Sequence, residues 1–126
     1  HNITDSYIIG HSSGGIISYN LLIKGNKRIK KLVTVCSPFH GTYLAYFFFF
    51  IKQASQLIPN SKLLRYLCPF FNKINNATSV YAKSDEITIP TRNARLHKKD
   101  DIMYPEFGHL SPIMSSTGID FLCKLI

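Results

Sequence analysis

Cysteine, tryptophan and acidic residues are scarce in this sequence. Its 126 residues include three cysteines, no tryptophan and seven acidic residues. The cysteines, Cys36, Cys68 and Cys123, are far apart and odd in number, and no C-x-x-C or Cys/His metal spacing occurs. The sequence therefore indicates neither a disulfide framework nor a zinc site.

Long apolar runs are also missing. The longest is "LAYFFFFI", residues 44–51, whereas a membrane-spanning helix needs about 20 apolar residues. Apolar residues nevertheless make up 45% of the chain. Because this composition and length are sufficient for one hydrophobic core, we expect a single folded domain over residues 1–126.

Basic residues outnumber acidic ones by 15 to 7, which gives a net charge of +8. Part of the excess lies in "KGNKRIKK", residues 24–31, which contains no aromatic residue. Without interleaved aromatics the run gives no specific support for nucleic-acid binding, so we expect no nucleic-acid partner. A solvated face, or contact with phosphate or an anionic membrane surface, are the remaining interpretations.

The chain starts at His1 and enters a strand-like segment almost at once. We interpret it as an N-terminally truncated domain whose upstream half is missing, and expect these 126 residues alone to be inefficient in catalysis and prone to associate. Cysteine usage favours the cytoplasm, but localisation stays open because a targeting segment would lie upstream.

Apolar runs and helix-forming segments alternate along the chain. Continuous β-branched and apolar runs predict buried strands at 6–9, 31–37, 78–83 and 101–105. Helices are predicted at 13–24 and from Thr117 to the end, a short helix or loop at 91–99, and one or two helices in an insertion at 42–76. This order predicts an α/β fold with a mostly parallel sheet of about four strands.

The two main helices carry further expectations. In the first, an apolar face should contain Ile16, Ile17, Leu21 and Leu22, and Gly25 should end the helix. In the last, a capping box of Thr117 and Asp120 should precede a shared face of Ile119, Leu122, Cys123 and Ile126.

The stretch "GHSSG", residues 10–14, reads as G-x-S-x-G between the first strand and the first helix. In a tight strand-to-helix turn the neighbours two positions from the serine must be small, which explains Gly10 and Gly14. The turn would expose the Ser12 hydroxyl beside the helix N-terminus, where the Ser13 N–H is the natural oxyanion donor. A glycine-rich turn with a capping serine, or a phosphate-binding turn, is the alternative interpretation.

A nucleophilic serine needs a histidine base, and a loop after the last strand contains His109. Of the other histidines, His1 and His11 lie in or before the turn and cannot easily reach back to Ser12. His40 follows the second strand and His97 lies in a basic stretch. His109 is therefore the best candidate, although alone it would be an ordinary loop histidine.

An acid is expected between the serine and the histidine in the chain, at the carboxyl ends of the strands. Asp85 and Glu86, just after the third strand, meet both conditions, and Asp85 is better placed. Glu106 is too close along the chain to His109 for an easy side-chain bond. The rejected acids are Asp5, Asp100, Asp101, Glu106 and Asp120. The sequence thus predicts a catalytic triad of Ser12, Asp85 and His109.

At this point the sequence resembles the α/β-hydrolase superfamily, and within it the small bacterial lipases and esterases. "GHSSGG" is similar to the family's nucleophile turn, "VTVCSPFHGTYLA" to its next strand and turn, "YAKSDEIT" to its aspartate loop, and "EFGHLSPIMSS" to its histidine segment. These patches run in order through nearly the whole chain. The family's first strands, and the loop that supplies a second oxyanion donor, have no counterpart here, and Thr88 stands where the family often has valine.

The resemblance implies a serine hydrolase that cleaves carboxylic esters of small molecules or lipids, without a metal or organic cofactor. An acyltransferase using the same triad, or a non-catalytic remnant, are the alternatives. Residues 42–76 occupy the position of a lid, so Phe47, Phe48, Phe49 and Phe50 are candidates to contact acyl chains or a membrane surface. The other interpretation is that these phenylalanines pack a helix onto the sheet.

Overall fold

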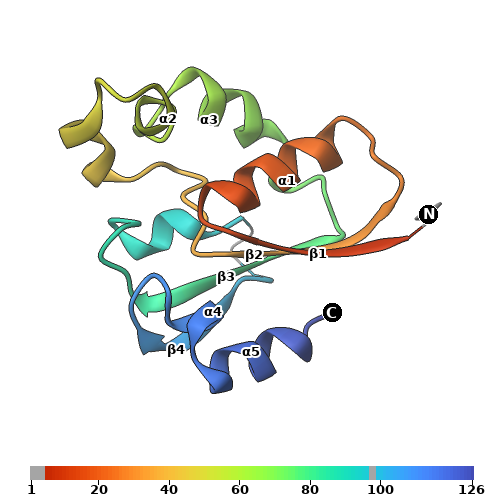
Figure 1. The fold of residues 1–126 in the computed structure, drawn as a ribbon. Helices are drawn as coiled ribbons and strands as arrows, with labels where there is room; N and C mark the ends of the chain where they lie inside the picture. Colours follow the sequence, from red (N-terminus) through yellow and green to blue (C-terminus); the bar gives the residue numbers. More distant parts are fainter. Residues whose placement is uncertain (1–4, 97–98) are drawn as a thin grey trace.

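A four-stranded parallel sheet forms the centre of the molecule. The computed structural model describes residues 5–96 and 99–126. The strands are β1 (Ser6–His11), β2 (Ile29–Val35), β3 (Ala77–Ser84) and β4 (Ile102–Phe107), paired in the order β1-β2-β3-β4 (Figure 1). The predicted parallel α/β sheet is confirmed; β1 and β3 extend slightly beyond their predicted ranges, and β2 and β4 are shifted by one or two residues.

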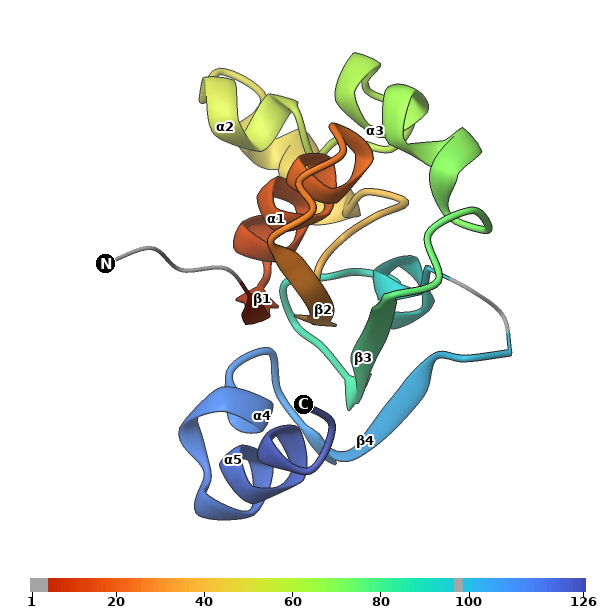
Figure 2. The ribbon, with the colours of Figure 1, turned by 90° about the vertical axis from the view of Figure 1, so that its right-hand side faces the viewer.

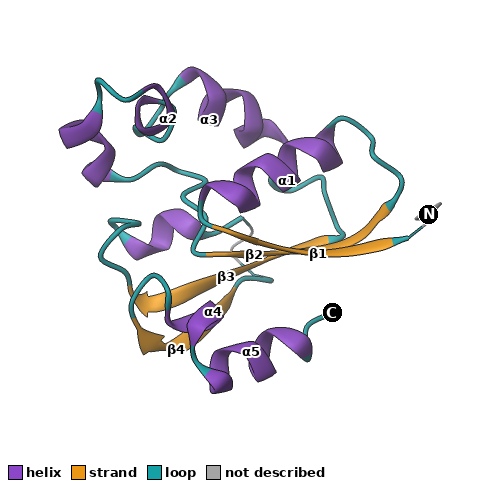
Figure 3. Ribbon diagram, in the orientation of Figure 1, coloured by secondary structure: helices purple, strands orange, loops and turns teal. Residues whose placement is uncertain are grey.

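Helices cover both faces of this sheet, as Figures 2 and 3 show. One layer contains α1 (Ser13–Ile23), α2 (Lys52–Ser55) and α3 (Lys62–Leu67), and the opposite layer contains α4 (Ser111–Met114) and α5 (Ser116–Cys123). Short 3₁₀ helices complete the set: η1 (Tyr43–Phe48), η2 (Cys68–Phe70) and η3 (Thr91–Ala94). Among the residues described, no helix is both long and apolar enough to cross a bilayer.

Two hydrophobic clusters lie on either side of the sheet. On the α1 side, Tyr19 packs edge-on against Phe39 and Phe71, above Leu32 of β2. On the other side, Val33 belongs to the cluster that α5 covers. Successive residues of β2 therefore pack into clusters on opposite faces of the sheet. Because both faces are buried, apolar residues in this strand are not restricted to alternate positions.

The predicted apolar faces of the helices are partly wrong. Ile16 and Leu22 of α1 are buried, but Ile17 is 64% and Leu21 is 42% exposed, and the fully buried residue between them is Tyr19. In α5 only Leu122 of the predicted face is buried; the exposed members are Ile119, Cys123 and Ile126. Each helix packs against the sheet with a narrow stripe, so apolar character alone overestimates the buried face.

Helix ends also depart from the prediction in one case. Gly25 follows α1 with a φ of +78°, as expected for a helix stop. The cap of α5 is Ser115, whose hydroxyl accepts from the Gly118 N–H, so the Thr117–Asp120 capping box is wrong. The Thr117 hydroxyl instead donates to Glu106.

The segment 42–76 contains short helices rather than one long one. Phe47, Phe48, Phe49 and Phe50 are all exposed, Phe47 by 76%. The interpretation that they pack a helix onto the sheet is therefore wrong. Of the helix or loop predicted at 91–99, η3 occupies the start, and residues 97–98 lie outside the described residues.

Candidate active site

Ser12 forms the sharp turn between β1 and α1. Its φ of 53° and ψ of −127° lie in a region that residues with a side chain rarely adopt. Such a conformation costs about 1–3 kcal/mol and persists only where the surroundings impose it. Here the Ser12 N–H donates to the Val35 carbonyl, which fastens the turn to the end of β2.

Close packing explains only one of the two predicted motif glycines. A Cβ on Gly10 would lie 2.7 Å from the Cα of Gly15, so Gly10 must lack a side chain. A Cβ on Gly14 would meet nothing within 4 Å, so the steric reason predicted for Gly14 is wrong. Gly15 takes that role, because its Cβ would collide with the Ser37 hydroxyl and with the Gly10 carbonyl.

Asp85 lies just beyond β3, in a buried position with several hydrogen-bond donors. Its Oδ1 accepts from the backbone N–H of Ile87 at 2.8 Å and of Thr88 at 2.7 Å. Burial by itself raises the pKa of a carboxyl group, but the hydrogen bonds from His109, Thr88 and Ile87 outweigh it, so the pKa of Asp85 is lowered. Asp85 is therefore ionised at neutral pH.

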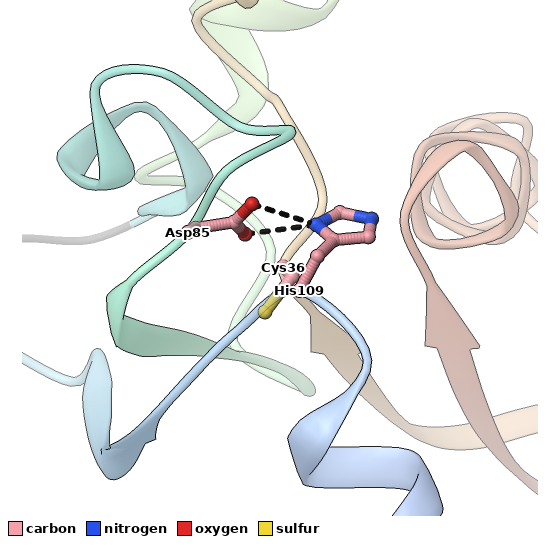
Figure 4. A group of neighbouring side chains, drawn as sticks. All are labelled: Cys36, Asp85 and His109. Atoms are coloured by element: carbon pink, nitrogen blue, oxygen red, sulfur yellow. Dashed lines mark hydrogen bonds and ion pairs between the residues drawn. The ribbon is translucent and has the colours of Figure 1, made fainter.

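His109 lies just beyond β4, and its imidazole meets this carboxylate. Its Nδ1 is 2.9 Å from Oδ1 and 2.8 Å from Oδ2 of Asp85, as Figure 4 shows. The His109 backbone N–H donates to Glu86, and the preceding Gly108, with φ +105°, donates its N–H to Ser84. Contacts with the end of β3 thus fix both the backbone and the ring of His109.

This pairing determines the tautomer of His109. An ionised carboxylate can only accept, so Nδ1 must carry the hydrogen and the neutral ring leaves Nε2 free as a proton acceptor. In Figure 4 that far nitrogen points away from Asp85 and toward the ribbon of α1, the helix that begins after Ser12. The orientation suits a general base that acts at the start of α1.

Ser12 and the Asp85–His109 pair are linked through a neighbouring residue. The Ser12 hydroxyl makes no hydrogen bond to other residues in the described part of the chain. His11, which directly precedes it, places Nε2 3.0 Å from the His109 carbonyl oxygen. Sequence reasoning set His11 aside, and nothing in its motif signals a contact with a residue 98 positions away.

Cys36 brings a third potential ligand to Asp85 and His109. Its Sγ, a carboxylate oxygen and a ring nitrogen all lie within 4.8 Å of one another, a set that suits zinc (Figure 4). Burial, followed by the charge of Asp85, raises the pKa of the Cys36 thiol to about 12, so the thiol stays protonated. Because Nδ1 of His109 is already hydrogen-bonded to the Asp85 carboxylate, a metal would have to break these hydrogen bonds.

The other residues considered from sequence lie elsewhere. Asp101 is paired with Arg95 at 2.9 Å, near the amino-terminal end of β4. His40 is exposed and its ring packs against Phe71. His40 also lines a cavity of about 1110 Å³ that lies against the start of β3. Ligands of open parallel sheets bind at the carboxyl ends of strands, so this cavity is at the wrong end for the Ser12 site.

Three polar positions at the carboxyl ends of β1, β3 and β4 therefore characterise the site, and the order of elements is that of an α/β-hydrolase. The chain has this fold in part, beginning with the strand before the serine turn. Several solved structures similar to it are named as hydrolases.

Two of these structures carry specific hydrolase names. One is a 2-hydroxy-6-oxo-6-phenylhexa-2,4-dienoate hydrolase from Rhodococcus sp. strain RHA1, with a TM-score of 0.63, 13% identity and coverage of 98% of this chain and 64% of that one. Another is a serine hydrolase from Cycloclasticus zankles, with a TM-score of 0.59, 16% identity and coverage of 98% and 64%.

A third is a lipase-esterase related protein from Clostridium acetobutylicum, with a TM-score of 0.62, 11% identity and coverage of 97% and 66%. The chain thus spans 57–66% of the length of the solved structures reported for it. No protein-family model matches the sequence, and no curated protein matches it significantly.

Proposed function

We propose that this chain carries the active site of a serine hydrolase for carboxylic esters, of lipase or esterase type. The observation that supports this most is the buried hydrogen bond between His109 and ionised Asp85, at the same sheet edge as the strained turn of Ser12. Fold likeness alone would not support it, since many functions use one scaffold.

In this proposal His109 Nε2 takes the hydroxyl proton of Ser12 while Oγ attacks the ester carbonyl carbon. The new oxyanion is stabilised by the N–H of Ser13, which as first residue of α1 has no intrahelical partner. Imidazolium His109 then protonates the leaving alcohol, and Asp85 stabilises the imidazolium. Water, deprotonated by His109, attacks the acyl carbon; His109 then gives this proton to Oγ of Ser12 as the acyl–oxygen bond breaks, which releases the acid and free Ser12.

Covalent labelling tests the nucleophile directly. The full-length protein should be labelled by a fluorophosphonate, and Ser12→Ala should abolish labelling and ester turnover. Ser116→Ala, at an exposed position at the start of α5, is the matched control and should keep both. Labelling that survives Ser12→Ala would overturn the assignment. Adding an alcohol to the turnover assay distinguishes hydrolysis from acyl transfer.

The exposed phenylalanines 47–50 suit contact with acyl chains or a lipid surface in this proposal. The segment 42–76 contains four basic residues, Lys52, Lys62, Arg65 and Lys73, and no acidic one. Aromatic rings beside positive charges favour anionic lipid interfaces.

Vesicle flotation tests the lipid contact. A Phe49→Ser, Phe50→Ser double variant should bind vesicles of phosphatidylglycerol less than wild type does, whereas Ile17→Ser on α1, similarly exposed, should not differ. Equal binding by wild type and the double variant would exclude these rings from the contact.

A further inference from the structure

His11 connects the serine turn to the base by a contact that the proposed mechanism has not yet used. It is the last residue of β1 and is half-buried. Its Nε2 lies 3.0 Å from the His109 carbonyl oxygen, and the two imidazole rings are 4.6 Å apart between centroids, tilted by 60°. Since a carbonyl oxygen can only accept, His11 donates from Nε2–H.

We propose that His11 is a positioning residue, which holds the His109 backbone against the serine turn so that His109 Nε2 stays directed at Ser12. The inference rests on the proposed function. His11 is covalently joined to Ser12, so its hydrogen bond couples the backbone of the base to the backbone of the nucleophile. This coupling requires no contact between the two catalytic side chains.

The other hydrogen bonds to His109 cannot replace this one. Asp85 holds the ring and Glu86 holds the backbone N–H, but both belong to the loop after β3. They locate His109 relative to β3 and leave its distance to the β1–α1 turn unfixed. In the described part of the chain, the hydrogen bond from the turn to His109 comes from His11.

The charge state of His11 suits this role. Burial lowers the pKa of His11, although the hydrogen bond to the His109 carbonyl and the charge of Asp85 act in the opposite direction. The charged groups that act on His11 are His109 and Asp85, from the loops after β4 and β3. A neutral His11 does not repel the imidazolium that forms on His109 during turnover.

Two substitutions separate the hydrogen bond from the charge. The amide nitrogen of glutamine has a reach similar to that of histidine Nε2, and it cannot be protonated. In the full-length protein at pH 7.5, His11→Gln should therefore keep kcat within about threefold of wild type, because the donor remains. His11→Ala should lower kcat about 10- to 100-fold with KM unchanged, because misplacement of a catalytic group by about 1 Å can cost 10²-fold.

The controls distinguish this inference from the proposed function. His40→Ala removes an imidazole that packs against Phe71 and lines the cavity at the start of β3, and it should leave kcat unchanged. Wild-type protein that lacks serine labelling would overturn the proposed function and, with it, any catalytic role of His11. Labelled, active wild-type protein with an equally fast His11→Ala variant would overturn the role of His11 alone, as would a glutamine variant as slow as the alanine one.

A spectroscopic measurement tests the geometry without turnover. Nitrogen-15 NMR of the imidazoles should show His11 protonated at Nε2 and bare at Nδ1 near neutral pH, with a protonation midpoint below 6.5. The charge of His109 is one of the causes that lower the pKa of His11, so substituting His109 by glutamine should raise that midpoint. An Nδ1-protonated His11, or a midpoint unaffected by His109→Gln, would contradict the proposed contact.

Discussion

Replacing Asp85 by asparagine tests the proposed mechanism where the geometry is best defined. Oδ1 of Asp85 accepts from two backbone N–H groups, at 2.8 and 2.7 Å, so in the variant the amide oxygen should keep this position. The amide NH₂ then replaces Oδ2, which lies 2.8 Å from Nδ1 of His109. The nearer neighbour of Nδ1 would then be a donor, so we expect the imidazole to move its hydrogen from Nδ1 to Nε2 rather than to donate to Oδ1 at 2.9 Å.

That shift removes the base. With its hydrogen on Nε2, His109 can no longer accept the proton of Ser12, and a wrong tautomer of this kind costs about 10⁴ in kcat, or about 5.5 kcal/mol of activation free energy. The folded state should lose far less, about 1–2 kcal/mol, because the backbone N–H groups remain satisfied. We therefore expect a folded protein with almost no turnover and nearly unchanged KM.

The assay is p-nitrophenyl ester hydrolysis over a range of pH, together with thermal unfolding of the same full-length samples. Asp120→Asn, an exposed position on α5, makes the same chemical change far from the site and should keep wild-type kcat. An Asp85→Asn variant within tenfold of wild-type kcat would refute the tautomer argument. A variant that does not fold would contradict the small stability cost expected.

Two further predictions concern stability. Gly15→Ala should lower the free energy of unfolding by about 1–3 kcal/mol because its Cβ collides with Ser37. Gly14→Ala should be neutral or stabilising by up to about 1 kcal/mol. Denaturant titration measures both, and a Gly14→Ala variant less stable than Gly15→Ala would contradict the packing described. The lowered pKa values of His11 and Asp85 mean that the unfolded chain binds more protons. Stability should therefore fall as pH drops below 6.5 for His11 and again below 3.8 for Asp85, and urea midpoints that stay level from pH 7 to 3 would contradict this.

The contact between Asp85 and His109 was predictable from the sequence because it depends on chain order and strand polarity. In a parallel sheet the carboxyl ends of all strands lie along the same edge, so residues that directly follow the neighbouring strands β3 and β4 come near each other. Asp85 and His109 each lie within two residues of a strand end, and they meet in the structure. Glu86, the alternative acid, contacts the same histidine through the backbone N–H.

Side-chain packing was much less predictable. The pattern of apolar residues in α1 does not distinguish Ile16, which is buried, from Ile17, which is exposed. Tyr19 is fully buried because its ring fits between Phe39 and Phe71 and its hydroxyl donates to the Phe70 carbonyl. Both partners lie in segments remote in sequence, so periodicity within the helix carries no information about them.

The steric role of two neighbouring glycines in the turn was also not predictable from the sequence. Gly14 and Gly15 are adjacent and identical, and the motif pattern points to the first of them. The structure gives the steric role to the second, because Ser37, from the segment after β2, places its hydroxyl where a Cβ of Gly15 would be. Ser37 also donates to the Gly10 carbonyl at 3.4 Å, so this buried side chain connects the turn with the segment after β2.

The strained backbone of Ser12 must be held in place by its surroundings. Ser12 cannot hold its φ of 53° by local preference, and its own hydroxyl makes no hydrogen bond in the described part of the chain. The restraint must come from the backbone hydrogen bond to Val35, from the close approach of Gly10 and Gly15, and from the contact between His11 and His109. All three act on backbone or neighbouring residues, so they leave the hydroxyl without a partner. In the proposed mechanism, a serine held in this way turns toward His109 when a substrate carbonyl arrives.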